Sequence, residues 1–178
     1  MSHEPSAIAR LPMPTPDRFD PARVADHLAT LASYPARLAG LVGGLDPYRL
    51  EATYREGGWN VTEIVHHVVD SHLHSYMRCK YALCESTPTI TPYEENDWVR
   101  TPDCSTETVA DALVLLAALH RRWTTFFRGL DQASWLRTFH HPGSGRDFAL
   151  FQQVEIYAWH GDHHLAHAAM ALGSEFPT

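Results

Sequence analysis

The chain has 178 residues, of which 44% are hydrophobic and 20% charged, as expected for a single globular domain with its own core. Its formal net charge of -7 argues against a nucleic-acid partner, which needs a basic face. Neither an apolar run of about 18 residues nor the hydrophobic segment of a signal peptide is found, so we expect no membrane partner and a cytoplasmic location.

Cysteine and histidine usage narrows the possibilities further. The three cysteines, Cys79, Cys84 and Cys104, are odd in number and lack a C-x-x-C spacing, so we expect reduced thiols and no disulfide framework. The chain also contains 13 histidines, which cluster along the sequence. Most histidines in proteins lie at the surface or are hydrogen-bonded in the core, so spacing has to identify any metal ligand.

The N-terminal part reads as a lead-in followed by a helix. Residues 1–19 are rich in proline and are predicted to be an extended lead-in, and residues 20–178 to be one domain. Asp20 precedes Pro21 as a cap residue precedes the first helical position, which predicts a helix up to about Gly43. Pro35 lies inside this helix and predicts a kink near its preceding residue.

A second long helix is predicted over residues 61–85. Asn60 and Glu63 have the spacing of a capping box at its start. One face of this helix is apolar, and another is polar. The polar face holds His67, Asp70, Ser71, His74 and Arg78. A polar stripe of this kind is either the solvated side of the helix or the lining of a site.

The rest of the chain predicts two further helices and a hairpin. Residues 86–105 form a long loop of the kind that covers a site or forms an interface. A third helix follows to about Gly129, and residues 138–148 predict a small hairpin around a Pro-Gly-Ser-Gly turn. A fourth helix over about 150–172 ends at Gly173. We therefore predict an all-α fold, a four-helix bundle with a small hairpin insertion.

The fourth helix carries an imidazole stripe. Four histidines occur within eight residues, at His160, His163, His164 and His167. At about 100° of rotation per residue, all four lie within about a third of the helix circumference. Two histidines one turn apart can hold a single metal ion between them, as they do in H-E-x-x-H metalloproteases. Periodicity alone leaves several equivalent pairs.

A third ligand has to come from the second helix if both polar stripes face the interior. We favour His67 over His66, because the helical wheel places His67 beside Asp70 and His74. His66 lies closer to apolar residues of the same helix and is expected to pack or to form a hydrogen bond.

Four stretches of the chain resemble the YfiT-like branch of the DinB superfamily, a group of metal-binding four-helix bundles. The stretches are Tyr54–Asn60, Val65–His72, Thr87–Ile90 and Tyr157–His167. The resemblance extends over most of residues 20–172. It implies that one histidine in a His-aliphatic-small-Asp pattern and two in a His-x-x-x-His pattern hold the metal.

In this chain those patterns fall on His67, His160 and His164. Val69 stands where the relatives tend to have alanine, a change that concerns packing only. Three neutral imidazoles and an open position are typical of catalytic zinc, and nickel accepts the same ligands, so we expect one Zn²⁺ or alternatively Ni²⁺ per chain. Asp70 and Tyr157 are candidates for orienting a ligand or moving a proton.

The resemblance implies two enzymatic functions. One is a metal-dependent hydrolase, and the other is an S-transferase that activates a low-molecular-weight thiol, similar to bacillithiol, and joins it to an electrophile. Arg78, Lys80 and Arg146 are cations that could bind a carboxylate on such a thiol. The ligand set alone leaves the two reactions open, so the expected partner is a small-molecule substrate.

A third possibility is a non-catalytic, metal-stabilised protein that acts as a dimeric stress-response binding module. Its metal site would be closed by a fourth protein ligand, for which His163 or His74 are available. The resemblance also implies a homodimer.

Overall fold

The computed structural model describes residues 5–177 of the chain. Its helices and strands are α1 (Pro5–Ile8), α2 (Pro21–Val42), α3 (Pro47–Leu50), α4 (Val61–Cys84), α5 (Glu95–Trp98), α6 (Val109–Arg128), β1 (Thr138–His141), β2 (Arg146–Ala149) and α7 (Leu150–Leu172). Two short 3₁₀ helices, Thr106–Thr108 and Ser134–Leu136, precede α6 and β1.

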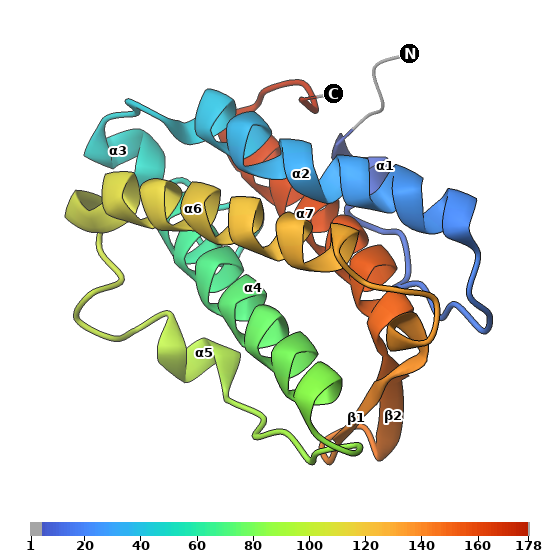
Figure 1. Ribbon diagram of the computed structural model, residues 1–178. Coiled ribbons are helices and arrows are strands. Elements are labelled where there is room, and N and C mark those ends of the chain that lie inside the picture. Colours follow the sequence, from blue (N-terminus) through green and yellow to red (C-terminus); the bar gives the residue numbers. More distant parts are fainter. Residues whose placement is uncertain (1–4, 178) are drawn as a thin grey trace.

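The four long helices form the predicted bundle. Figure 1 shows α2 and α6 side by side, lying across α4 and α7. Helix α2 packs against α7, and α6 packs against α4. The hairpin of β1 and β2 extends from one end of the bundle, and the chain continues from it directly into α7. The fold prediction of an all-α bundle with a small hairpin is therefore confirmed.

The helix ends follow the signals in the sequence. The Asp20 side chain accepts hydrogen bonds from backbone N–H groups in the first turn of α2, and Asn60 and Glu63 form the reciprocal capping box of α4. Gly173 ends α7 in the left-handed conformation at φ 61°, which favours glycine. Local chemistry at the termini thus determines where three of the four long helices begin or end.

The core is divided along the bundle axis into two hydrophobic clusters. One cluster includes α4 as far as Val69 and α7 from Leu165 onward. The other includes α4 from Tyr76 onward and α7 as far as Tyr157. Two of the five buried histidines, His72 and His164, lie between these positions, and buried His67 lies just before Val69. The middle of the bundle is therefore a polar layer enclosed between two apolar ones.

Two predictions about connecting segments need correction. The lead-in is not extended throughout, because α1 forms a short helix at Pro5–Ile8, and residues 1–4 lie outside the described part. The backbone carbonyls of Leu11 and Pro16 accept hydrogen bonds from Trp159 and Gln152 of α7, so the lead-in is fastened to the bundle. The predicted loop 86–105 contains the short helix α5, which its sequence of charged and proline residues did not reveal.

Helix α2 continues without interruption through Pro35, from Pro21 to Val42. Since proline has no N–H group, the carbonyl of Leu31 loses the donor that it would have four residues later. No helix among residues 5–177 is long and apolar enough to cross a membrane.

The close packing of α2 against α7 predicts a specific mutational effect. A Cβ at Gly161 would lie 2.8–3.1 Å from ring atoms of Tyr34, so Gly161→Ala should lower the free energy of unfolding. Overpacking of this kind costs about 1–3 kcal/mol, measurable by urea denaturation.

Gly40→Ala is the matched control for this substitution. A Cβ at Gly40 meets no atom within 4 Å, so this change in α2 should raise stability by about 0.5–1 kcal/mol. Equal effects of the two substitutions would show that the Tyr34 ring yields without cost.

Candidate metal centre

Three histidines from two helices meet in the polar layer. His67 comes from α4, whereas His160 and His164 are one turn apart on α7. One potential ligand atom of each ring lies within 4.8 Å of those of the other two. The Nε2 atoms of His67 and His160 face each other at 3.2 Å. The structure thus brings together the three residues that the sequence predicts as metal ligands.

Burial makes these rings neutral at physiological pH. Desolvation lowers the pKa of His67 to about 4, and it lowers the pKa of His160 and His164 well below the usual value, with neighbouring imidazoles adding to the effect. A neutral imidazole has one nitrogen lone pair free to bind a metal ion. Three such lone pairs in one small volume suit zinc or nickel.

The hydrogen bonding of the three rings also fits a metal ion. The Nδ1 atoms of His67 and His164 are buried and have no hydrogen-bond partner in the structure. Nδ1 of His163, outside the cluster, is unpaired as well, so these atoms do not single out the site. The three rings fit a metal ion because each can be neutral with its proton on Nδ1 and a lone pair on Nε2. Metal binding by the three histidines stays a prediction that these observations support.

The two spare histidines lie elsewhere. His163 stacks on Trp159 with ring centroids 4.7 Å apart, and His74 stacks on Tyr93 at 4.3 Å. Within residues 5–177, the group of potential ligands consists of His67, His160 and His164 alone. The described part of the chain therefore offers no fourth protein ligand that closes the site.

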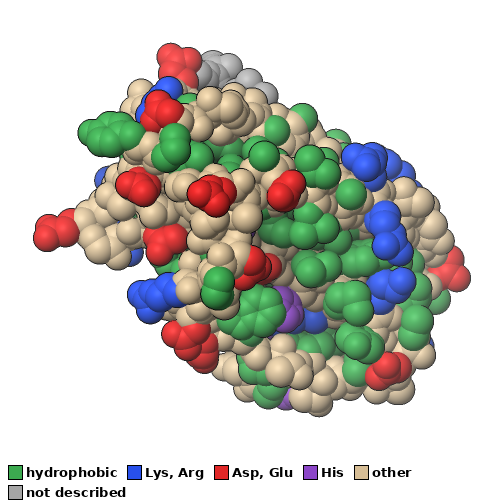
Figure 2. All heavy atoms as spheres, turned by 90° about the vertical axis from the view of Figure 1, so that its left-hand side faces the viewer, with side chains coloured by type: hydrophobic (Ala, Val, Ile, Leu, Met, Phe, Trp, Pro, Cys, Tyr) green, Lys and Arg blue, Asp and Glu red, His purple; other side chains and the backbone are tan. Residues whose placement is uncertain are grey.

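The segment between α4 and α6 reaches over the site. Trp59 packs its ring 4.5 Å from that of His67, and its Nε1–H donates a hydrogen bond to the side chain of Asn96 in α5. Further along, the backbone of Ile90 donates to the carbonyl of His140 in β1. Figure 2 views this side of the molecule, where a histidine lies between hydrophobic side chains and acidic groups are spread over the surface nearby.

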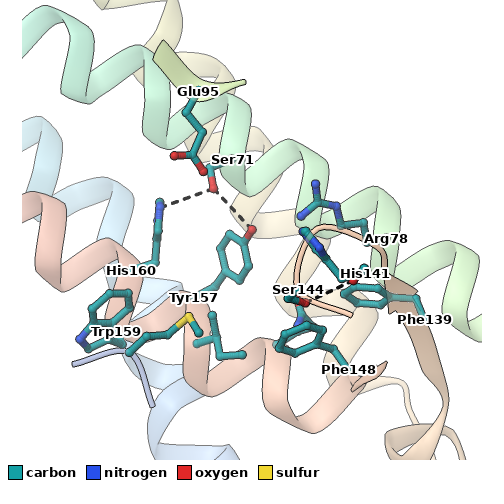
Figure 3. A pocket seen from close by; sticks show the side chains of 13 residues that line it. Ser71, Arg78, Glu95, Phe139, His141, Ser144, Phe148, Tyr157, Trp159 and His160 are labelled. Atoms are coloured by element: carbon teal, nitrogen blue, oxygen red, sulfur yellow. Dashed lines mark hydrogen bonds between the residues drawn. The ribbon is translucent and has the colours of Figure 1, made fainter. Parts of the chain in front are cut away.

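A pocket of about 250 Å³ borders the cluster at His160. Figure 3 shows Ser71 at this end, within 3.5 Å of His160 Nε2 and 3.4 Å of the Tyr157 hydroxyl, with the Glu95 carboxylate pointing toward it. At the other end lie Arg78 of α4 and the residues of the hairpin. The pocket therefore has an acidic group near the cluster and a basic group at its far end.

The two candidate supporting residues differ in their surroundings. Tyr157 is buried, its ring centroid lies 5.3 Å from that of His160, and burial raises the pKa of its hydroxyl. Asp70 forms no hydrogen bond with any described residue. Its burial, and to a smaller extent the negative charge of nearby Asp103, raise its pKa to about 6. Tyr157 thus lies beside a predicted ligand, and the role of Asp70 stays a prediction.

His66 behaves as predicted, since its Nε2 lies 3.1 Å from the carbonyl of Ser105 and so donates a hydrogen bond to it. Sequence reasoning missed His72, whose Nε2 lies 3.0 Å from Nδ1 of His160. It lies about 140° around α4 from His67, so the helical wheel separates the two. Glu95 and His141 were missed because their positions depend on how the loop and hairpin fold onto the bundle.

Comparison with known proteins agrees with this arrangement. The sequence profile of the DinB superfamily matches residues 30–168 of the chain. The protein belongs to the DinB superfamily.

Within this superfamily the chain is 47% identical over 133 residues to a protein of Bacillus mycoides, covering 75% of this chain and 76% of the relative. It is 42% identical over 142 residues to a protein of Halalkalibacterium halodurans, covering 80% and 82%. Both relatives carry the name "Putative metal-dependent hydrolase".

A solved DinB-like structure is similar over nearly its whole length. It is YfiT from Bacillus subtilis, described as "a probable metal-dependent hydrolase with an unusual four-helix bundle topology". YfiT is 34% identical to this chain. The aligned region covers 90% of this chain and 94% of YfiT, and the two structures superpose with a TM-score of 0.85. The bundle, and with it the relative placement of α4 and α7, is therefore shared.

The site predicts which histidines determine metal content. Protein loaded with Zn²⁺ and dialysed should retain about one ion per chain, and His67→Ala should lose it because two imidazoles remain. Zinc is measured by mass spectrometry, and unfolding temperature is compared with and without metal, since a ligand of the native state raises it.

His163→Ala serves as the control, because His163 lies on the same stripe of α7 without joining the cluster. It should keep the ion and the metal-dependent rise in unfolding temperature. Loss of zinc in this variant and not in His67→Ala would assign the ion to another site.

The buried rings also predict how stability depends on pH. Desolvation lowers the pKa of His67 and His120 to about 4, whereas both titrate near 6.5 when the chain is unfolded. Below pH 6.5 the unfolded chain therefore binds more protons than the native one, so stability falls as pH decreases toward 4. The loss approaches about 3 kcal/mol per ring at the lower end.

Urea denaturation of metal-free protein at pH 7.5, 6 and 5 checks this dependence. A free energy of unfolding that stays constant from pH 7.5 to 5 would show that the rings are accessible to protons in the folded state.

Proposed function

We propose that this protein is a metal-dependent hydrolase whose ion, zinc or alternatively nickel, is held by His67, His160 and His164. The observation that carries the proposal is the position of the cluster: three neutral imidazoles meet beside a pocket whose wall includes one of them, His160. Three histidine ligands with a remaining position for a small molecule are typical of catalytic zinc. The names of the relatives point to the same class of reaction.

A zinc ion bound there would polarise a substrate carbonyl and lower the pKa of a water molecule or a thiol. The chain itself supplies a group for proton transfer. Burial, and then the neighbouring Glu94, raise the pKa of Glu95, which brings it closer to the working pH of a general base. In this proposal Glu95 accepts the proton of the attacking nucleophile, while Ser71 and Tyr157 orient the substrate by hydrogen bonds.

The far end of the pocket favours a substrate with an anionic group. Arg78 and His141 line this end together with the aromatic rings of Phe139 and Phe148. Lys80 and Arg146, the other two cations considered from the sequence, do not line it: Lys80 lies over the ring of Tyr76, and Arg146 over that of Phe148. A carboxylate bound to Arg78 would place the rest of a small molecule toward His160.

Arg78 also favours the second candidate, an S-transferase that uses a carboxylate-bearing, low-molecular-weight thiol. In this reaction the thiol loses its proton to Glu95, and the sulfur forms a bond to an electrophile while the leaving group departs. The two reactions differ in the nucleophile, not in the residues that hold it. The expected homodimer stays a prediction for either function.

One experiment compares these functions. Zinc-loaded protein is incubated with p-nitrophenyl esters and anilides, and separately with cysteine plus 1-chloro-2,4-dinitrobenzene. We expect cleavage that depends on zinc and falls by about 100-fold in Glu95→Gln, the size of effect typical of a lost general base. Asp97→Asn is the control, because Asp97 is an exposed carboxylate of the same helix α5 and does not line the pocket.

Each other result selects a different conclusion. Zinc-dependent conjugation of the thiol without cleavage would replace the hydrolase by the transferase. The absence of both reactions over a broad panel, with zinc still bound and stabilising, would favour the non-catalytic binding protein.

A further inference from the structure

A chain of three imidazoles leads from the cluster to the backbone of α2. His160 Nδ1 lies 3.0 Å from Nε2 of His72, and His72 Nδ1 lies 2.8 Å from Nε2 of His120 on α6. The chain ends where Nδ1 of His120 lies 2.7 Å from the carbonyl oxygen of Leu31. Four helices are thus linked by consecutive hydrogen bonds.

The final acceptor determines the direction of every bond in this chain. A carbonyl oxygen can only accept, so the proton of His120 is on Nδ1 and its Nε2 carries a lone pair. His72 must then donate from Nδ1 to this lone pair, and its own Nε2 carries a lone pair. By the same step His160 donates from Nδ1, which leaves its Nε2 as a lone pair facing His67.

This derivation requires neutral rings, and their surroundings provide for that. His72 and His120 are 0% and 1% exposed, and no carboxylate of residues 5–177 is hydrogen-bonded to either of them. The ring of His72 packs against aromatic side chains, with Tyr34 at 5.5 Å, Tyr157 at 5.1 Å and Trp123 at 5.8 Å between centroids. Burial among apolar rings without a counter-charge favours the neutral form.

The anchor itself depends on a proline. In a regular helix the carbonyl of Leu31 would accept from the N–H four residues later, but that residue is Pro35, which has none. The oxygen is therefore free of the helix ladder, and the N–H of His120 takes the place of the missing donor. Pro35 is 1 turn away from the anchor and needs no contact with the metal cluster to act on it.

We propose that His72 and His120 are positioning residues that hold His160 in the tautomer with a free Nε2, and thereby raise the affinity of the site for zinc. Metal-bound histidines usually donate their other N–H to a carboxylate, a carbonyl or water. Here the carbonyl acts through two further rings, and each hydrogen bond polarises the next. The proposal rests on the metal site proposed above for its effect on affinity, whereas the tautomers are properties of the metal-free protein.

The tautomers are measured first, on metal-free wild-type protein at pH 7.5, by long-range ¹H–¹⁵N correlation of the imidazole nitrogens. We expect His72, His120 and His160 to carry their protons on Nδ1. An Nε2-protonated His160 in the wild type would overturn the proposal without reference to metal or activity.

Zinc affinity is measured next, by competition with a chromophoric chelator. His120→Phe keeps an aromatic ring but removes the acceptor of His72, so the tautomer of His160 should become mixed and affinity should fall about 10- to 100-fold, as for other outer-sphere partners. His120→Gln offers an amide oxygen to His72 and should restore part of the affinity. Wild-type affinity in His120→Phe would overturn the positioning role.

Thr124→Val is the matched control on α6. Its hydroxyl is buried and donates to the carbonyl of His120, one turn earlier, without joining the imidazole chain. This variant should keep the His160 tautomer and the affinity for zinc, and an equal loss of affinity in it would attribute the effect to α6 as a whole and overturn the proposal. A wild-type protein with the expected tautomers but no zinc binding would refute the proposed metal site and the effect on affinity, while leaving the hydrogen-bond directions established.

Discussion

The arrangement of this protein depends on keeping imidazole rings uncharged inside a helical bundle. A buried charge without a partner costs far more than a hydrogen bond returns, so the rings either lose their protons or leave the core. Here they are enclosed by aromatic side chains and by hydrophobic clusters on both sides of the polar layer. Neutral rings can bind metal and hydrogen-bond to one another, and in this layer the three proposed ligands lie beside the hydrogen-bonded rings of His72 and His120.

Close packing of the backbone makes the polar layer possible. Gly161 follows His160 directly, and because it has no side chain the ring of Tyr34 lies against α7. This contact brings α2 near α7, with Leu31 one turn before Tyr34. Arg37, further along the same helix, forms an ion pair with Asp162 at 2.7 Å. Packing between α2 and α7 therefore supports a site whose three candidate ligands come from α4 and α7.

The sequence allows most of the fold and the central histidines to be predicted. Helical periodicity, caps and a Pro-Gly-Ser-Gly turn act within a few residues, so Asn60 or Gly173 can be interpreted without tertiary structure. His160 and His164 are one turn apart for the same local reason. Choosing them from four candidates required the resemblance to a family, since a helical wheel treats all four alike.

The remaining features depend on how elements cross, which local patterns do not encode. His72 lies on a different side of α4 from His67, and it meets His160 only because α7 passes over both. Glu95 reaches the pocket through the path of a long connecting segment. Asp70 shares a helical face with His67 but forms no hydrogen bond with a described residue, so its role stays a prediction.

The N-terminal lead-in has a practical consequence for experiments with this protein. Met13 and Trp159 both line the pocket, and the indole of Trp159 is hydrogen-bonded to the carbonyl of Leu11. The segment before the first long helix is therefore part of the pocket wall. A shortened start that removed Leu11 and Met13 would take away this part of the wall, so activities measured on differently trimmed preparations need not agree.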